Sequence, residues 1–282
     1  MSPRRRSTRL SLAIPSSLVS EVPHLREKTG VIGQVGRAAA IFRVEDIYIY
    51  PDEPNESNLI RLILSYMETP QYLRRRMFRR RPELRYVGVL PPLRTPHHPL
   101  ESRTSMLRRG EKREGIVLDE VNGEFVVDVG VDERLGAIGQ APSIGGRATV
   151  EITEVHPRLR GRFIGRGDVE TYWGYSVHVS KRSLLSLTSA GEFDLTLATS
   201  QGGVLYTVVE RDLRKWLKNS RSALIAFGSP KRGLEDVVNS EGGNLEEMFH
   251  YMVNTIPKQG CKTVRTEEAV YSTLAILNLI TS

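Results

Sequence analysis

Cysteine and long apolar runs are scarce in this sequence, and each shortage excludes a class of protein. Cys261 is the only cysteine among 282 residues, so neither an internal disulfide nor a cysteine-rich metal site can form. The pair His97-His98 alone is too little to indicate a metal site. No apolar run is long enough to cross a bilayer, and the arginine-rich start lacks the apolar core of a signal peptide. We therefore expect a cytoplasmic protein.

Positive charge is in excess, with 40 lysines and arginines against 33 acidic residues and a formal net charge of +7. The excess is densest at residues 74–81. Arginine binds phosphate through a planar fork of donors, so this density favours a nucleic-acid partner, although an ion-paired, solvated surface has the same composition. RNA contacts are predicted at Arg74, Arg75, Arg76, Arg79, Arg80, Arg81, Lys112 and Arg113.

Two parts of the chain alternate short apolar runs with amphipathic stretches, which is typical of parallel strands joined by helices. The final helix is apolar around nearly its whole circumference, which predicts burial in its own fold, against a partner subunit, or both. In the first part we expect strands at residues 9–14, 46–50 and 85–90, and helices at 23–42 and 56–67. In the second part we expect strands at 173–179, 193–199, 223–227 and 248–253, and helices at 182–187, 208–219, 234–239 and 266–279.

Residues 94–169 follow a different pattern of short apolar strands and turns, which predicts a small inserted barrel such as an OB fold. Asn122-Gly123 is a strong hairpin signal between two of its strands. We expect this insert to be a second RNA-binding surface. The predicted strands are 115–121, 124–131, 148–155 and 160–164, and the predicted domain boundaries are 1–93, 94–169 and 170–282.

Two loops rich in glycine and proline follow consecutive predicted strands, at residues 227–233 and 254–265. Loops at the carboxyl ends of neighbouring parallel strands bind ligands in α/β proteins, so these two predict one shared pocket. The first loop lacks the Gly-Lys-Ser/Thr ending of a phosphate-binding loop, which argues against an NTPase. Gly30, Gly33 and Gly36 imitate a dinucleotide fingerprint, but they lie within a helix that precedes a strand, so we reject that interpretation.

Five short segments, spread over most of the chain outside the insert, resemble those of one family. They are Tyr50-Pro51-Asp52, residues 68–74, residues 89–99, Phe227-Gly228-Ser229-Pro230 and residues 254–269. The family is the SPOUT class of RNA methyltransferases (α/β-knot enzymes), in its archaeal–eukaryotic subfamily with an inserted OB-like domain. The resemblance implies an α/β fold: a SPOUT-type parallel sheet whose C-terminal segment forms a trefoil knot, plus a small all-β OB-like barrel.

The resemblance also implies S-adenosyl-L-methionine as the cofactor, held in the knot mainly by backbone groups of three loops. It implies a homodimer in which the partner completes each site. Glycines at 228, 233 and 260 would let the main chain approach the adenine, so valine at 228 or 260 should block cofactor binding. The implied cofactor-binding residues are Thr199, Ser200, Gln201, Phe227, Gly228, Ser229, Pro230, Gly233, Asn254, Ile256, Pro257, Gln259, Gly260, Thr263, Val264 and Thr266.

A sulfonium methyl donor is already activated, so no metal is needed, but the acceptor must be positioned and must lose a proton. Glu267 and Glu268 are candidates for the base, and Arg265 and Arg94 for stabilising the developing anion. The helix macrodipole alone would also favour the two glutamates at a helix N-terminus. The histidine pair at the domain junction either contacts RNA or packs there.

Residues 263–269 resemble the corresponding segment of enzymes that methylate uridine N3 of ribosomal RNA, which favours a ribosomal base as the target. A transfer RNA or a ribose 2′-hydroxyl is the alternative target. A non-catalytic RNA-binding or ribosome-assembly factor is the alternative class of protein, because no single residue is an unmistakable catalyst.

Overall fold

The protein, seen here as a computed structural model that describes residues 3–280, divides into two compact units. The first, which we call the sheet unit, holds Arg6–Glu68, Arg81–Pro92 and the described chain from Gly174 onward. The second, the barrel unit, holds residues 3–5, Thr69–Arg80 and Leu93–Trp173.

The sheet unit is built on six strands in the order β11-β9-β10-β1-β2-β8. Every neighbouring pair is parallel, as the alternation of strands and helices predicts. The first strand is buried at every position after its first residue, as in a sheet covered on both faces. The strands are β1 (Arg9–Pro15), β2 (Asp46–Tyr50), β8 (Ser176–Val179), β9 (Leu195–Leu205), β10 (Ser222–Ala226) and β11 (Tyr251–Asn254).

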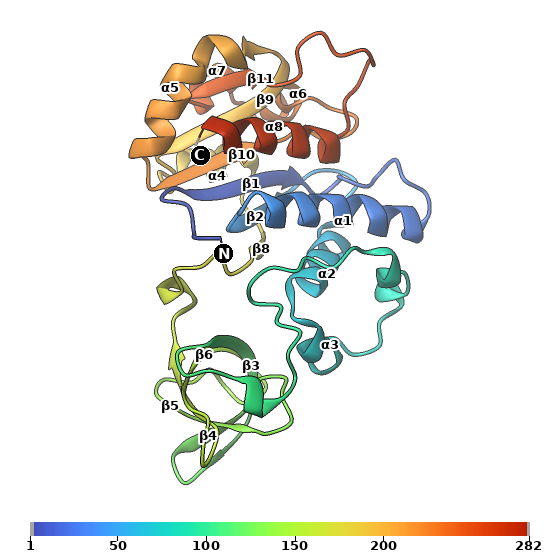
Figure 1. Ribbon diagram of the computed structural model, residues 1–282. Coiled ribbons are helices and arrows are strands. Elements are labelled where there is room, and N and C mark those ends of the chain that lie inside the picture. The colour runs from blue at the N-terminus through green and yellow to red at the C-terminus, as the bar shows by residue number, and fades with distance from the viewer. Residues whose placement is uncertain (1–2, 281–282) are drawn as a thin grey trace. The chain divides into compact units, whose positions relative to one another are not determined.

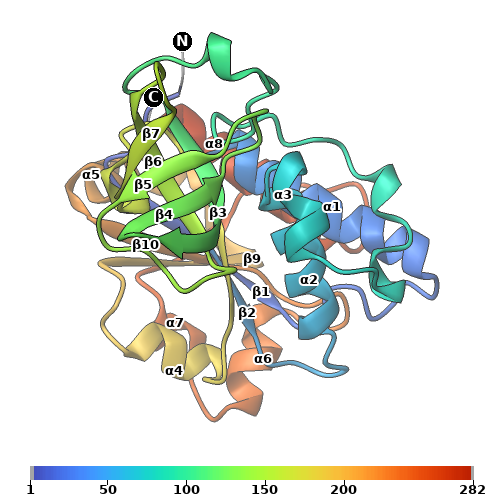
Figure 2. The same cartoon turned by 90° about the horizontal axis from the view of Figure 1, so that it is seen from below.

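Helices cover both faces of this sheet (Figures 1 and 2). The helices of the sheet unit are α1 (Leu25–Ile41), α2 (Ser57–Glu68), α4 (Leu184–Ser189), α5 (Tyr206–Asn219), α6 (Leu234–Ser240), α7 (Leu245–Met248) and α8 (Thr266–Ile280). On one face α1 lies against both α2 and α8. On the other face α4, α6 and α7 share one apolar core with strand residues such as Leu224 and Ala226.

Two glycines of α1 serve close packing. A methyl group on Gly33 would come within 2.4 Å of Leu90 Cδ2, and one on Gly36 within 2.8 Å of the Tyr175 hydroxyl. The glycine run therefore lets neighbouring segments approach the helix backbone, which agrees with the rejection of a dinucleotide fingerprint.

The barrel unit contains five strands that close in the order β3-β4-β5-β7-β6. β5 and β7 pair in parallel, and the other pairs are antiparallel. Asn122 and Gly123 form the tip of the predicted hairpin, with φ of 52° and 81° as a type I′ turn requires. The elements are α3 (Gln71–Met77), β3 (Lys112–Val121), β4 (Glu124–Asp128), β5 (Leu135–Ile138), β6 (Arg147–Glu154) and β7 (Arg160–Ile164).

One predicted strand is wrong. Residues 85–90 form no strand; a 3₁₀ turn at Pro82–Leu84 is followed by another at Val87–Val89. A short apolar run between prolines does not distinguish a strand from such turns. The short elements α3, α7 and β5 were not predicted. None of the helices within residues 3–280 is long and apolar enough to cross a membrane.

Candidate functional site

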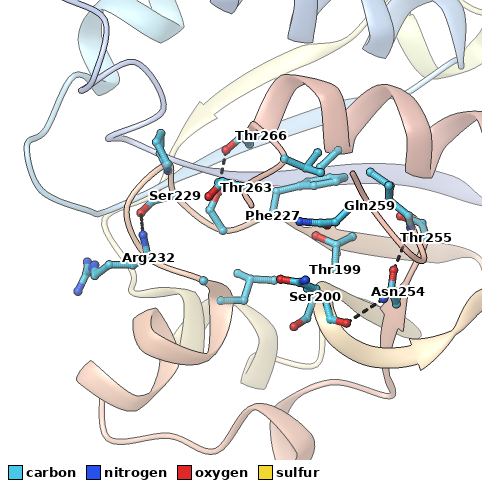
Figure 3. Close-up of a pocket in the computed structure, with 18 of the residues that line it drawn as sticks. Thr199, Ser200, Phe227, Ser229, Arg232, Asn254, Thr255, Gln259, Thr263 and Thr266 are labelled. Carbon is cyan, nitrogen blue, oxygen red and sulfur yellow. Dashed lines mark hydrogen bonds between the residues drawn. The ribbon is translucent and has the colours of Figure 1, made fainter. Parts of the chain in front are cut away.

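A pocket of about 330 Å³ opens beside three neighbouring strands of the sheet unit, at residues 199–201 within β9 and at the carboxyl ends of β10 and β11 (Figure 3). Three chain segments form its walls: residues 199–201, 227–234 and 253–269. Ligand pockets typically measure about 300–1,000 Å³. The carboxyl edge of the sheet thus holds a cavity of ligand size, where two of the predicted loops meet.

The first wall exists because β9 breaks its pairing with β11. Met252 pairs with Ala198, but the next residue, Val253, pairs with Val204. The residues of β9 between these two partners therefore bulge away from the ladder. Asn254 Nδ2 ties the bulge down by donating to the Gln201 carbonyl at 2.8 Å, as Figure 3 shows.

The second wall is the loop after β10, and hydrogen bonds fix both of its sides. The Tyr50 hydroxyl donates to the Phe227 carbonyl at 2.7 Å, and the Thr266 hydroxyl donates to the Gly228 carbonyl at 3.0 Å. Within the loop, the Ser229 amide donates to the Arg232 carbonyl at 2.9 Å, and the Arg232 amide donates to Ser229 Oγ at 3.0 Å. The loop is therefore a closed turn that hydrogen bonds hold both internally and to its neighbours.

An ion pair also ties this loop to the segment after β2. Arg232 Nη2 donates to Asp52 Oδ1, and Ser17 Oγ donates to Asp52 Oδ2. The Asp52 side chain is 1% exposed, whereas the Arg232 side chain is 39% exposed and lines the pocket. Residues that follow β1, β2 and β10 are thus joined through one buried carboxylate.

The third wall runs from β11 to α8. The Ile256 amide donates to Asn254 Oδ1 at 3.0 Å, which turns the chain as it leaves the strand. Gln259 Nε2 donates to the carbonyls of Cys261 and Lys262 at 3.0 and 3.1 Å. The side-chain amide of Gln259 thus holds the tip of the loop through two hydrogen bonds.

The pocket brings together all but two of the predicted cofactor-binding residues. Pro257 and Gly260 do not line it, so their contact with a cofactor stays a prediction. Sequence reasoning missed a further set of lining residues. They are Lys231, Arg232, Leu234, Val253, Thr255, Lys262 and Ala269. The lysines and the arginine stand inside the two predicted loops, so their charge was a signal that they border the site.

The four catalytic candidates do not line the pocket, and their role stays a prediction. Thr266 and Ala269 of α8 face the cavity, whereas Glu267 is buried elsewhere and Glu268 accepts a hydrogen bond from the Arg265 amide at 2.9 Å. Burial raises the pKa of Glu267. Arg94 is exposed in the barrel unit with a φ of 53°.

The predicted RNA-binding arginines fall into different environments. Arg75, Arg79, Arg80 and Arg81 are exposed. Arg74 donates to the Thr69 carbonyl at 2.9 Å. The first three exposed residues belong to the barrel unit and Arg81 to the sheet unit.

Two of the predicted RNA-binding residues form ion pairs within the barrel unit. Arg76 pairs with Asp128 at 3.1 Å, and Lys112 lies 3.9 Å from Glu151. RNA contact by Arg113 stays a prediction, and the burial of its side chain does not support it. Its side chain is 0% exposed, because strand alternation turns it inward, where it donates to the Glu101 carbonyl at 2.7 Å.

Known proteins match this chain over nearly its whole length. A family described as "Putative RNA methyltransferase" matches residues 9–277. The chain belongs to this family. The RNA methyltransferase is 32% identical to the human 28S rRNA (uridine-N(3))-methyltransferase, over 97% of this chain and 79% of the human protein.

Two further relatives also match most of the chain. The mouse protein of the same name is 30% identical over 95% of the present RNA methyltransferase and 75% of its own length. An uncharacterized protein of Halobacterium salinarum is 33% identical, over 95% of this chain and 98% of its own. The protein is therefore an enzyme that requires a methyl donor and an RNA substrate.

Proposed function

We propose that this methyltransferase uses S-adenosylmethionine to methylate N3 of a uridine in ribosomal RNA. The observation that carries the proposal is the pocket at the carboxyl ends of β10 and β11 and beside residues 199–201 of β9. The names of the human and mouse relatives supply the ribosomal uridine. A transfer RNA or a ribose 2′-hydroxyl has no such support.

The lining residues fit the chemical parts of S-adenosylmethionine. Phe227, Ile256 and Val264 offer apolar walls for a flat purine. Thr199 and Asn254 offer neutral polar groups for its edges and the ribose. A cationic set suits the carboxylate of the methionine part and nearby RNA phosphates: Lys231, Arg232 and Lys262.

When bound, S-adenosylmethionine supplies a methyl group on a sulfonium, which a nucleophile can attack without further activation. The chain's own task is to hold the acceptor in line and to stabilise the charge that develops on it. Among the described residues that line the pocket there is no Asp, Glu or His. We infer that the cationic set of Lys231, Arg232 and Lys262 stabilises the deprotonated uracil and that the N3 proton passes to water.

We also propose the finer fold assignment, a SPOUT domain with a C-terminal trefoil knot and an OB-like insert. Support for the knot is that the chain leaves the edge strand β11, passes the loop after β10 at Thr266, and then packs α8 on α1. Support for the OB-like insert is the barrel's strand order together with the parallel pairing of β5 and β7.

A homodimer is the quaternary structure that we propose. The final helix was expected to be apolar nearly all round, and it leaves apolar groups uncovered by its own chain. Leu279 is 71% exposed, and Ala275, one turn earlier, is also exposed. A second subunit that packs on this side would bury them.

Two measurements test the proposed function. Calorimetric titration should detect S-adenosylmethionine binding to the purified protein, and nucleoside mass spectrometry of ribosomal RNA from a deletion strain should lose 3-methyluridine. A protein without measurable cofactor binding would instead be the RNA-binding or assembly factor. Loss of a different methylated nucleoside would keep the enzyme but replace its target.

A further inference from the structure

A second cavity of about 330 Å³ lies in the barrel unit, formed by β3, β6, β7 and residues 140–142. Strand register places Glu114, Thr149 and Ile164 in one row, since Thr149 is the partner of the other two. The neighbours of Thr149 on β6, Ala148 and Val150, belong to the barrel core. Strand alternation therefore puts the cavity on the outer wall of the barrel.

A buried carboxylate lines this cavity. Glu114 is 2% exposed and accepts hydrogen bonds from Arg147 Nε at 2.5 Å, from Thr149 Oγ1 at 2.7 Å, and from the Trp173 indole N–H. An ionised carboxylate has about four acceptor sites. Glu114 is thus held in a fixed position and can accept a further hydrogen bond from a ligand.

The rest of the lining combines cations, an apolar side chain and an amide. Arg147 and Arg166 contribute two guanidinium groups, and Arg166 Nη2 donates to the Trp173 carbonyl at 2.7 Å. Ile164, the cross-strand partner of Thr149, adds the apolar side chain on the same face, whereas the Phe163 ring packs against the barrel core. Gln140 adds an exposed side chain that can both donate and accept.

We propose that this cavity binds one nucleotide of the single-stranded RNA substrate, an inference that rests on the proposed function. A simple anion would be repelled by Glu114, and a simple cation by the two arginines. A nucleotide satisfies the whole set. Its base offers N–H donors to the carboxylate and an edge to Gln140, its flat face suits the apolar Ile164, and its phosphate suits the guanidinium groups.

The inference is tested by fluorescence anisotropy with short labelled oligo-U, oligo-A and oligo-C RNA and the full-length protein. The variants are Gln140→Ala and Arg147→Gln. Arg109→Gln is the control, because it removes the same charge from an exposed position that does not line the cavity. Thermal unfolding of each variant detects loss of the fold. Arg147→Gln leaves Glu114 without its ion-pair partner, so the exposed Gln140 provides the variant that is safe for folding.

Gln140→Ala should weaken binding of the preferred oligomer by about three- to tenfold and reduce the preference among the three RNAs. Arg147→Gln should weaken all three and lower the salt slope by about 0.7. Arg109→Gln should keep the preference of the parent protein. In addition, 4-thiouridine in the oligomer should cross-link within residues 139–166.

The inference is overturned if both cavity variants fold and keep the affinities and the preference of the parent. It is also overturned if the cross-links map to other parts of the barrel unit. Calorimetric titration of the same samples with S-adenosylmethionine separates this failure from that of the proposed function. If the parent binds the cofactor and RNA and the variants are unchanged, only the inference about the second cavity fails. If the parent binds no RNA, both that inference and the proposed function fail.

Discussion

Gly228 begins the turn that forms one wall of the pocket, and backbone atoms surround it. A methyl group there would lie 3.0 Å from both the Arg232 carbonyl oxygen and the Leu234 amide nitrogen. Nothing lies within 4 Å of the equivalent position on Gly260, which also does not line the pocket. Valine at position 228 and valine at position 260 are therefore expected to affect cofactor binding differently.

Gly228→Val should lower S-adenosylmethionine affinity about tenfold or more, because the loop must open to admit the side chain. The matched variant Gly260→Val should retain the affinity of the parent within about threefold. Calorimetric titration measures both. Equal losses in the two variants would contradict this assignment of the wall.

Glu267, which lies in α8, should make the stability of the folded protein depend on pH. Burial raises its pKa above the ordinary 4.5, so between the unfolded and folded pKa values the native state binds more protons than the unfolded state. The contribution of this group to stability is complete below pH 4.5 and is lost as pH rises through the folded pKa. Above that point the buried carboxylate is a net cost.

Glu267→Gln should therefore become more stable relative to the parent as pH rises from about 4.5 towards neutrality. Urea unfolding at a series of pH values measures the difference in the free energy of unfolding. An unchanged difference across the series would contradict the burial argument. If the carboxylate is instead the catalytic base, the same variant loses activity by a hundredfold or more, on the order expected for a general base.

At the scale of elements, the pocket depends on loops that belong to strands far apart in sequence. Asp52 follows β2, whereas Arg232 follows β10, and their ion pair spans 180 positions of the chain. Tyr50 reaches the same loop at the Phe227 carbonyl. The shape of the wall after β10 is thus fixed in part by residues at the end of β2, which lies two strands away in the sheet.

Asp52→Asn should raise the dissociation constant for S-adenosylmethionine about tenfold, equivalent to about 1.4 kcal/mol. The wall residue Arg232 loses its charged anchor, while its half-exposed side chain can be hydrated, so the fold should survive. Methyl transfer at saturating cofactor should fall much less. Glu192→Gln is the control, since it removes an exposed ion pair with Arg182 in the same unit, and it should leave the affinity unchanged. A tenfold loss in both variants would point to net charge rather than to the loop.

Much of this architecture could be predicted at the level of elements. A run such as β10, apolar at nearly every position, indicates a strand covered on both faces, and Asn122-Gly123 fixes its hairpin by turn chemistry alone. The prediction of a strand at residues 85–90 was wrong because so short an apolar segment shows no periodicity that would distinguish a strand from turns. α7, with only four residues, is too short for a periodic pattern to show.

The site was predictable only where its residues are contiguous. The loops at 227–233 and 254–265 are recognisable by their glycine and proline, and most of their residues line the pocket. The Asp52–Arg232 pair and the inward turn of Arg113 depend on strand order and on the phase of alternation in the barrel. Neither can be inferred from local residue type.

On the scale of the whole molecule, the exposed arginines of the barrel unit are the surface expected to hold RNA. Arg75, Arg79 and Arg80 are exposed, unlike the buried Arg113. Backbone phosphates bind such groups without regard to sequence, so their contribution is salt-dependent.

Reversing Arg75, Arg79 and Arg80 to glutamate should weaken binding of single-stranded RNA and reduce the dependence of log K on log salt by about 0.7 for each phosphate that is no longer neutralised. Anisotropy titrations at several salt concentrations measure the slope. Lysine at the same three positions keeps the charge and should keep the slope. Equal slopes for the glutamate variant and the parent would remove this surface from the RNA path.

The pairing of β1 with β10 sets an order of events during synthesis. Arg9 aligns with Ser222, so β1 cannot pair with β10 until the whole barrel unit has been translated. The barrel's own strands are close in sequence and can pair as soon as they leave the ribosome. A nascent chain halted before β10 would therefore carry a complete barrel but lack the segments after β10 and β11 that form the pocket.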